Sequence, residues 1–279
     1  MNESSLVLYE VQQSVATITL NRPKSLNAMT SGLMKDLANA LARVEADKSV
    51  RVAVITGSGR GFCAGADLAG QASSKPSDPE PEGKVDDYFN GAMRAIYNSS
   101  VPTVARVNGA AAGGGFGLAL ACDIAVAAKS SFFVATFGPR LGIVPDLGTT
   151  WNLPHKAGRA RALGLAMLGD RISAEQAEAW GLIWKAVEDD QLDAEVEQIT
   201  TNLARYQLSR ITVHPWHGRN TLLIMLLTQM GRLVCQEVAK YHELSTELTR
   251  QRFFLASELL LDTQALSSRR SCRITAAFA

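Results

Sequence analysis

The 279-residue chain is neither strongly charged nor poor in apolar residues. Its 28 basic and 27 acidic side chains leave a formal net charge of +1, without the strongly basic field that nucleic-acid binding usually needs. Apolar residues make up 47% of the sequence, which excludes a disordered or fibrous protein and supplies a large buried core. These bounds favour an enzyme that acts on a small molecule.

Patterns for secretion, metal binding and membrane insertion are missing from the sequence. Residues 1–5 contain no basic stretch followed by an apolar core, so we expect no secretory signal and a cytoplasmic protein. The four cysteines form no CxxC pair, which favours reduced thiols, and His214 with His217 has no further ligand cluster. The apolar run 222–227 is too short to span a bilayer. We therefore expect no metal, membrane or nucleic-acid partner.

Strand and helix patterns alternate from the beginning of the chain. Residues 7–11 and 15–20 are short β-branched runs separated by three polar residues, which predicts a hairpin. Residues 31–46 carry apolar side chains at helical spacing, and the apolar run 52–56 that ends at Gly57 is typical of a buried strand.

The alternation continues with a predicted helix at 87–97, a strand at 103–107, a helix at 113–121 and a strand at 124–128. This order indicates crossover connections and stacked βαβ-like units, in which ligands gather at the strand-to-helix loops. From Gly148 onward the pattern predicts mostly helix.

Two later features are local. Residues 69–84 hold three prolines and no apolar period, which predicts a surface loop that is either a lid over a ligand or simply disordered. Ser173 and Gln176 have the spacing of a capping box, and Gly181 is expected to end the helix that follows.

Two glycine-rich stretches, 60–68 and 108–117, each follow a strand-like run. Glycine adopts backbone angles that are closed to other residues and lets a ligand approach the chain closely. Two such loops can direct two backbone N–H groups at one oxygen, where losing one donor typically costs on the order of 100 to 1,000-fold in rate. We therefore expect chemistry that passes through an enolate or a tetrahedral oxyanion.

Four motifs stand in order along the chain, at 21–29, 59–68, 108–117 with Cys122-Asp123, and 141–146. Together they resemble the crotonase, or enoyl-CoA hydratase/isomerase, superfamily. The resemblance implies an α/β crotonase (ClpP-like) fold, a spiral of ββα units with a C-terminal helical region. It also implies an acyl-CoA thioester substrate, no cofactor apart from the coenzyme A of that substrate, and a homotrimer or dimer of trimers.

The resemblance covers roughly residues 5–205, so we expect a crotonase core with the acyl-CoA site at 1–205. Residues 206–279 would be a C-terminal helical region that is atypical for the family, because the resemblance is lost near Gln207. A change of reading frame in the gene is one hypothesis for this loss, and an intact frame on resequencing would exclude it.

By this resemblance, Ala66 and Gly114 would supply the two N–H groups to the thioester oxygen. The alternative is that glycine-rich loops only let a helix pack against a strand. Asn27, Ala28 and Met29 match the family segment that borders the CoA adenine and pantetheine, mainly through its backbone. A turn that merely starts the next helix is the alternative for that segment.

Five further residues complete the expected CoA-binding set. Arg22 and Lys24 would meet CoA phosphates, although exposed basic side chains usually have no such partner. Asp67 resembles the family's loop aspartate, with structural capping as its alternative role. Ala64 and Leu68 belong to the same stretch and are assigned to substrate binding with it.

The expected reaction depends on which carboxylates the chain carries. Hydratases of the superfamily use two glutamates, whereas this chain has Gly117 at the first position and Phe137-Gly138 near the second, which disfavours addition of water. Asp146 matches the working aspartate of several isomerases and dehalogenases, and partial desolvation would raise its pKa so that it takes and returns a proton. Its alternative role is to cap the helix that begins near Gly148.

The segments 141–146, 157–162 and 181–184 resemble the ring-epoxide isomerases of bacterial phenylacetate degradation, which convert 1,2-epoxyphenylacetyl-CoA to an oxepin-CoA. We therefore expect an acyl-CoA isomerase that works through a thioester enolate. The alternatives are an isomerase of 3-enoyl-CoA to 2-enoyl-CoA, an enoyl-CoA hydratase of fatty-acid oxidation, and a non-catalytic acyl-CoA-binding protein.

Two details qualify this site. Cys63 lies beside the expected oxyanion donors, but no base is placed to activate it, so inert packing is expected. Thr149 stands where many relatives have glycine, which adds a side chain at a point of close backbone approach.

Overall fold

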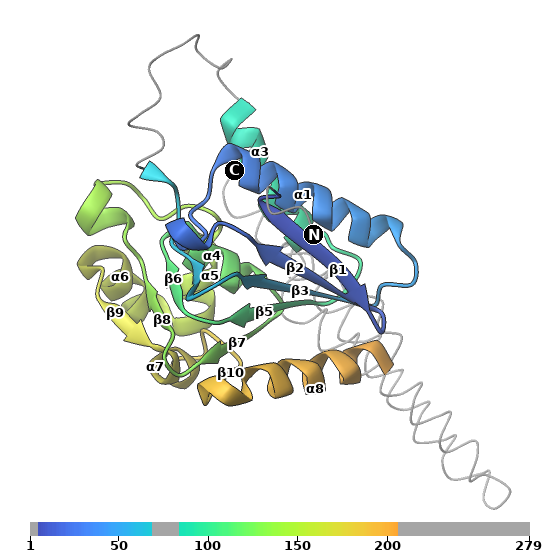
Figure 1. Ribbon diagram of the computed structural model, residues 1–279. Helices are drawn as coiled ribbons and strands as arrows, with labels where there is room; N and C mark the ends of the chain where they lie inside the picture. Colours follow the sequence, from blue (N-terminus) through green and yellow to red (C-terminus); the bar gives the residue numbers. More distant parts are fainter. Residues whose placement is uncertain (1–4, 69–83, 206–279) are drawn as a thin grey trace, which may run out of the picture. The chain divides into compact units, whose positions relative to one another are not determined.

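The computed structural model describes residues 5–68 and 84–205 (Figure 1). The expected lid at 69–84 lies outside the described residues except for its last residue. The atypical region from Gln207, with the hypothesis of a frame change, lies wholly outside them. The expected boundary between 205 and 206 therefore stays a prediction.

A six-stranded sheet begins with the expected hairpin. β1 (Val7–Gln12) and β2 (Val15–Leu20) are antiparallel, and Gln13 and Ser14 between them have φ of 47° and 68°. A two-residue turn with two positive φ angles matches the twist of the flanking strands. The other neighbours pair in parallel in the order β1-β2-β3-β5-β7-β10, with bounds β3 (Val52–Gly57), β5 (Thr103–Val107), β7 (Ile124–Ala128) and β10 (Lys185–Val187).

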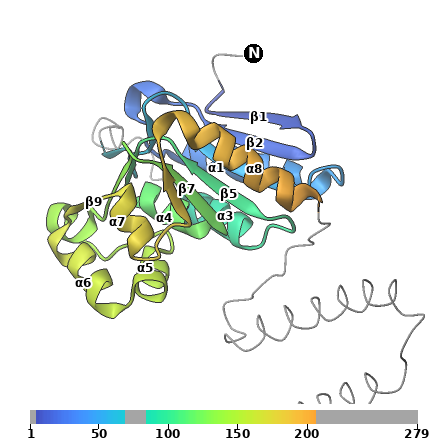
Figure 2. The same ribbon diagram turned by 90° about the horizontal axis from the view of Figure 1, so that it is seen from below.

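Strand β3 is buried on both faces because its alternating side chains belong to two cores. Ala53 and Ile55 join the larger core, whereas Val52 and Val54 join a smaller one with residues of α8 (Leu192–Arg205). Figure 2 shows α8 lying across the strands β5 and β7. A sheet covered on both faces has continuous apolar strands, which is the pattern the sequence shows.

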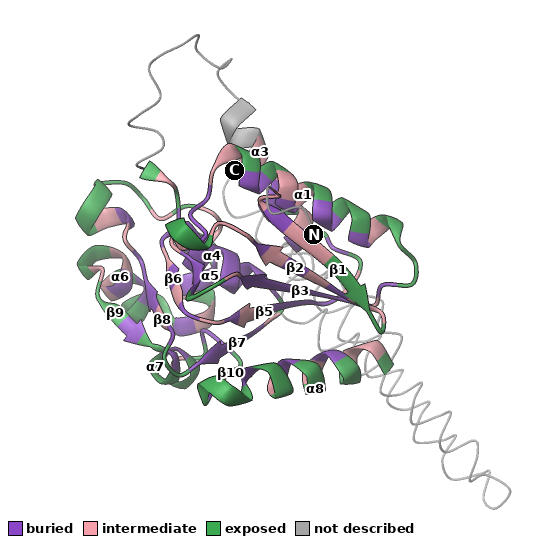
Figure 3. Cartoon of the chain, viewed as in Figure 1, coloured by how far each residue is buried: buried purple, intermediate pink, exposed green. Residues whose placement is uncertain are grey.

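Helices α1 (Ser31–Ala46) and α3 (Lys84–Tyr97) pack against each other and belong to the larger core. Thr30 caps α1, since its Oγ1 accepts a hydrogen bond from the Leu33 N–H at 3.2 Å. The buried stripe along α1 is visible in Figure 3. The predicted helix at 31–46 is confirmed, and the next helix begins three residues earlier than the expected residue 87.

A second sheet of four short strands was missed by the sequence analysis. Its order is β4-β6-β8-β9, with bounds β4 (Gly61–Cys63), β6 (Ala110–Ala112), β8 (Phe132–Val134) and β9 (Arg171–Ser173). The glycine-rich stretches are therefore partly strand rather than loop throughout. The described chain after Gly148 is mostly helical as expected, with β9 and β10 as two short strands within it. Three-residue strands are too short to show an alternating pattern, so whether they form depends on the segments that pack beside them in the fold.

The remaining described elements are helices and short turns that connect the strands. Ser173 caps α7 as expected, because its Oγ accepts from the Gln176 N–H at 3.1 Å, and Gly181 with φ of 75° follows that helix. None of the described helices has the length and apolar character needed to cross a membrane. The other bounds are α5 (Thr149–Ala157), α6 (Arg159–Leu168), α7 (Ala174–Ala179) and the short turns η1 (Pro23–Ser25), η2 (Phe137–Leu141) and η3 (Asp189–Gln191).

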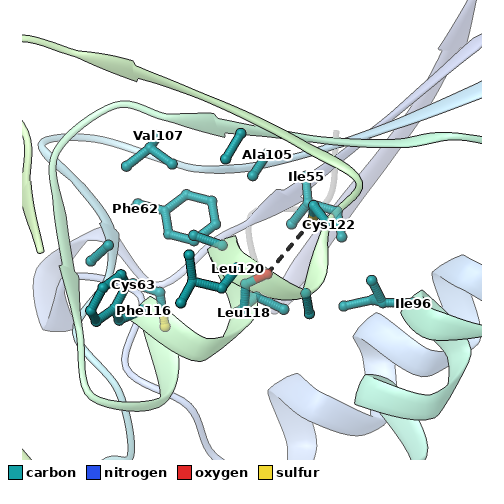
Figure 4. Packing of buried hydrophobic residues seen from close by; sticks show 14 of the residues in the cluster. Ile55, Phe62, Cys63, Ile96, Ala105, Val107, Phe116, Leu118, Leu120 and Cys122 are labelled. Atoms are coloured by element: carbon teal, nitrogen blue, oxygen red, sulfur yellow. Dashed lines mark hydrogen bonds between the residues drawn. The ribbon is translucent and has the colours of Figure 1, made fainter. Parts of the chain in front are cut away.

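Helix α4 (Gly114–Ala121) is buried along its whole length. Figure 4 shows Phe116, Leu118 and Leu120 of this helix among side chains of the two sheets, including Ile55 and Phe62. A helix that is apolar on all sides is stable only inside a core. The packing therefore fixes the start of α4, where the second glycine-rich motif lies.

Gly115 tests this packing, because a Cβ at that position would fall directly on the carbonyl oxygen of Cys63. We expect Gly115→Ala to lower the free energy of unfolding by about 3 kcal/mol, the upper range for overpacking a core. Gly164→Ala is the control: outside the backbone of α6 and the neighbouring residues, no atom lies within 4 Å of its Cβ position, so the variant should gain about 1 kcal/mol. Urea unfolding followed by circular dichroism measures both, and equal stabilities would contradict the packing.

Candidate functional site

The two glycine-rich motifs meet where β4 and β6 end. These strands are parallel neighbours, so the chain leaves both at the same edge of the sheet. A Cβ on Gly65 would lie 2.8 Å from the Ala112 carbonyl oxygen and 3.2 Å from the Gly114 nitrogen. Gly65 and Gly113 also have φ of 88° and 51°, which favours glycine. Two glycines 48 residues apart in sequence, Gly65 and Gly113, thus meet in the structure.

The backbone of Ala66 is held by an isolated parallel bridge to Met29. The Met29 N–H donates to Gly65 O at 2.7 Å, and the Asp67 N–H donates to Met29 O at 2.9 Å. In this pattern the N–H of Ala66 itself points away from Met29. The bridge therefore aims the Ala66 amide without using it.

The Gly114 amide is uncommitted for a different reason. Gly114 is the first residue of α4, and the first N–H groups of a helix have no intrahelical acceptor. Across residues 5–68 and 84–205, no hydrogen-bond acceptor is found for the N–H of either Gly114 or Ala66. The positive end of the α4 dipole adds to the attraction for an anion. The pair is therefore a candidate oxyanion site, and the same glycines also permit the close packing that was its alternative.

Asn27 holds the start of the glycine-rich stretch 59–68 in place from a fully buried position. Its Nδ2 donates to the carbonyl oxygens of Ser58 and Gly61 at 3.0 and 2.8 Å, and its Oδ1 accepts from the Arg22 N–H at 2.8 Å. Asn27 itself has φ of 57°. Because its side chain is used within the protein, any contact of Asn27 with CoA would be made by backbone, as the resemblance implies. Ala28 and Met29 are buried beside it.

Arg22 and Asp67 form an ion pair with 2.8 Å between Nη2 and Oδ2. Arg22 also donates to the Ala28 carbonyl oxygen, so its side chain links the segment 21–29 to Asp67 in the loop after β4. Asp67 thus has a structural partner in Arg22, and the pairing neutralises the charge that Arg22 would offer to a CoA phosphate.

The other residues of the expected CoA-binding set differ in exposure. Lys24 lies exposed on η1, and Leu68 is 50% exposed. Ala64 is partly exposed, and its N–H donates to the Leu26 carbonyl oxygen at 3.0 Å. Their roles in CoA binding stay predictions.

Asp146 lies in the turn before α5. The N-cap of α5 is Gly148, and Asp146 contributes its carbonyl oxygen rather than its carboxylate, accepting from the Thr149 N–H at 2.8 Å. The alternative that its side chain caps the helix is therefore wrong. The residue as a whole is exposed, but neighbouring chain partly desolvates its carboxyl group and raises the pKa of Asp146.

Tyr97 of α3 supports this turn and was missed by sequence reasoning. Its hydroxyl accepts from Asn152 Nδ2 at 2.6 Å and lies 2.5 Å from where a Cβ on Gly148 would be. Burial raises the pKa of Tyr97, so the phenol stays protonated at neutral pH. Leu147 and Gly148 in the turn both have positive φ, of 47° and 76°. No sequence pattern links Tyr97 to a turn 50 residues away.

The positions that carry glutamates in hydratases have no room for side chains. A Cβ on Gly117 would lie 2.6 Å from the Leu147 carbonyl oxygen and 2.7 Å from Thr149 Oγ1. A Cβ on Gly138 would lie 2.6 Å from the carbonyl oxygen of Ala166, and Phe137 is buried. The packing around Gly117 and Gly138 therefore excludes a glutamate side chain at either position.

Cys63 is inert, as expected. The thiol is fully buried and donates to the Asn27 carbonyl oxygen at 3.1 Å, and burial raises the pKa of Cys63 to about 12. The described part of the chain also contains no group of three His, Cys, Asp or Glu side chains that would hold a metal ion.

The chain belongs to the enoyl-CoA hydratase/isomerase family, whose model matches residues 10–213. It is 44% identical over 200 residues to the 1,2-epoxyphenylacetyl-CoA isomerase of Escherichia coli K12, covering 71% of this chain and 76% of that protein. It is 40% identical over 199 residues to a probable enoyl-CoA hydratase of Rhodobacter capsulatus, covering 71% and 75%.

A solved structure of a monofunctional enoyl-CoA isomerase from M. smegmatis matches with a TM-score of 0.60 and 32% identity, over 72% of this chain and 85% of that one. The predicted α/β crotonase fold is thereby confirmed. The protein is an enzyme of a family that acts on acyl-CoA thioesters.

Replacing Asn27 tests whether its hydrogen bonds anchor the start of the glycine-rich stretch 59–68. Asn27→Ala leaves one buried and one partly buried carbonyl oxygen and one amide without their partner, so we expect a loss of about 3 kcal/mol in the free energy of unfolding. Lys24→Ala, at an exposed site on the same turn, should change it by less than about 0.5 kcal/mol. If chemical denaturation gives both variants wild-type stability, the network does not hold the motif.

Proposed function

We propose that the protein is an acyl-CoA isomerase that works through a thioester enolate. The N–H groups of Ala66 and Gly114 would bind the thioester oxygen, and Asp146 would move the proton. The observation that carries the proposal is that the Asp146 carboxyl group is free of a capping role and has a raised pKa. Gly117 meanwhile leaves no room for a hydratase glutamate.

The two amides address the main barrier to enolate formation. Removing a proton next to a thioester places negative charge on the carbonyl oxygen, and pre-organised donors stabilise that charge more than the neutral ground state. The bridge from Met29 and the buried helix α4 fix the two amides before substrate arrives. The protein therefore has little reorganisation to perform as charge develops.

Asp146 supplies both halves of the proton transfer in this proposal. As a carboxylate it would take the α-proton, and as a carboxylic acid it would return the proton to another carbon. The raised pKa brings the two protonation states closer in energy near neutral pH, which suits a group that works as base and then as acid. A single carboxylate is sufficient for isomerisation, because no water has to be activated.

We propose a ring epoxide of phenylacetyl-CoA as the substrate, supported by similarity to the Escherichia coli isomerase. Loss of the α-proton would give an enolate whose electrons drive opening of the epoxide, followed by rearrangement to the seven-membered oxepin ring. An identity of 44% establishes the family, whereas the acyl group is the part that we propose.

The second candidate is the isomerisation of a 3-enoyl-CoA to a 2-enoyl-CoA, because Asp146 and the same amides would serve it. Asp146 would then remove a proton at C2 and return one at C4. The lack of room at Gly117 argues against hydration, and the uncapped carboxyl group of Asp146 argues against a purely binding role. We also propose a cytoplasmic homotrimer or dimer of trimers, as the resemblance implies.

The proposal predicts turnover without a change of mass. The full chain should isomerise 1,2-epoxyphenylacetyl-CoA or 3-hexenoyl-CoA, and Asp146→Asn should lower kcat at least about 1,000-fold, since it removes the proton shuttle. Asp170→Asn, at an exposed aspartate in the turn after α6, is the matched control and should keep wild-type activity. Mass spectrometry that finds a gain of water, or an active Asp146→Asn variant, would reject the proposal.

The raised pKa of Asp146 sets the sign of two pH effects. The base works only when deprotonated, so kcat/KM should fall on the acid side at a pH above the ordinary carboxyl value of about 4. A folded-state pKa above the unfolded one adds stability at low pH that is lost as the pH rises through the folded value.

Asp146→Asn should therefore melt at least as high as the wild type at pH 7, where the wild-type carboxylate is charged. Thermal unfolding at pH 4 and pH 7 measures the difference. A lower melting temperature of Asp146→Asn at pH 7 would contradict the assigned direction of the pKa shift.

A further inference from the structure

Thr149 carries a hydroxyl group that the proposed mechanism does not use. Its Oγ1 is the only buried side-chain oxygen or nitrogen in the described part of the chain that has no hydrogen-bond partner. The residue is fully buried at the first position of α5. The nearby polar side chains of Tyr97 and Asn152 are bonded to each other. Folded proteins rarely leave such a group unpaired, so this hydroxyl group calls for a structural or functional explanation.

The position of this hydroxyl relates it to the candidate oxyanion site. Thr149 Oγ1 lies 2.7 Å from the point that a Cβ on Gly117 would occupy. Gly117 is three residues after Gly114, so both lie on one face of α4, about 5 Å apart along one helical turn. The hydroxyl therefore lies about one turn along α4 from the amide that would bind the thioester oxygen.

Leu147 covers the same face of α4. Its Cδ1 lies 2.5 Å from the Cβ position of Gly114, and its carbonyl oxygen lies 2.6 Å from that of Gly117. Leu147 is only partly buried, and its φ of 47° is a conformation that a leucine rarely adopts. A strained residue over a binding face is a common feature of functional sites. Rotation of the Leu147 side chain would open the part of this face beside Gly114 to an acyl group.

We propose that the Thr149 hydroxyl donates a hydrogen bond to an oxygen on the β-carbon of the acyl group. This inference rests on the proposed function, because the thioester oxygen at Ala66 and Gly114 sets the position of the β-carbon. The path from that oxygen through C1, C2 and C3 to a β-oxygen has a reach comparable with one helical turn.

The hydrogen bond would matter most for a substrate whose β-carbon carries an epoxide. When the carbon–oxygen bond opens, its electron pair goes to the epoxide oxygen, where a hydroxyl donor stabilises the developing charge. A 3-enoyl-CoA has no oxygen at this position and would leave Thr149 unpaired. Thr149 thus acts as a specificity-determining residue for oxygenated acyl groups.

Equilibrium binding tests the inference without requiring turnover. Calorimetric titration of the full chain compares 3-hydroxyhexanoyl-CoA with hexanoyl-CoA, which differ by the β-oxygen alone. The wild type should bind the hydroxylated thioester about 10-fold more tightly, the ratio expected for one hydrogen bond to a buried partner. Thr149→Val should remove this preference by weakening only the hydroxylated ligand, and Thr149→Ser should retain most of it. The exposed Thr150→Val control should keep the wild-type ratio.

The inference also predicts that Thr149 does not stabilise the fold. The unpaired hydroxyl costs stability in the free protein, so Thr149→Val should melt at the same temperature as the wild type or higher, whereas a structural role predicts a lower melting temperature. It should also isomerise 3-hexenoyl-CoA within about 3-fold of the wild type. Equal weakening of both ligands, or a preference that survives in Thr149→Val, would overturn the inference and leave the proposed function intact. Failure of the wild type to bind either thioester would overturn both.

Discussion

Close backbone contact between the end of β4 and the first turn of α4 is the constraint on which the site depends. Gly65 lies against the Ala112 carbonyl oxygen, next to the Gly114 nitrogen, and Gly115 lies against Cys63, at separations that leave no room for a side chain. The apolar surface of α4 holds this contact from inside the core, and the Met29 bridge holds it from the other side. The positions of the two amides are therefore a consequence of core packing, and stability and proposed function share the same residues.

The turn at 146–149 adds the second part of the proposed site, and it contains two residues with positive φ. Two successive positive φ angles place Asp146 outside the helix that follows, so its carboxyl group is not consumed as a cap. The same turn places Leu147 and the unpaired Thr149 hydroxyl against α4. Such features cost stability in the free protein and are retained where a site needs them. Thr149, which stands where many relatives have glycine, also places its hydroxyl group where a side chain at position 117 would lie.

Much of this was predictable from the sequence, because the information is local. Apolar periodicity predicted α1 and β3, and the two glycine motifs predicted backbone segments that meet in the structure, whereas the chemical role of Asp146 stays a proposal. What failed was long-range or very short: the three-residue strands of the second sheet, the pairing of Arg22 with Asp67, and the contact of Tyr97 with Gly148. These depend on which segments meet after folding, and no window of sequence contains both partners.

The central claim is that Asp146 removes the α-proton of a thioester while the amides of Ala66 and Gly114 stabilise the resulting enolate. Hydrogen–deuterium exchange at C2 tests this claim most directly. A saturated thioester such as hexanoyl-CoA has no later step available, so exchange in D₂O reports enolate formation alone. We predict that the full chain incorporates deuterium at C2 and that Asp146→Asn does not, although both bind the thioester. Binding by the wild type without any exchange would contradict the account.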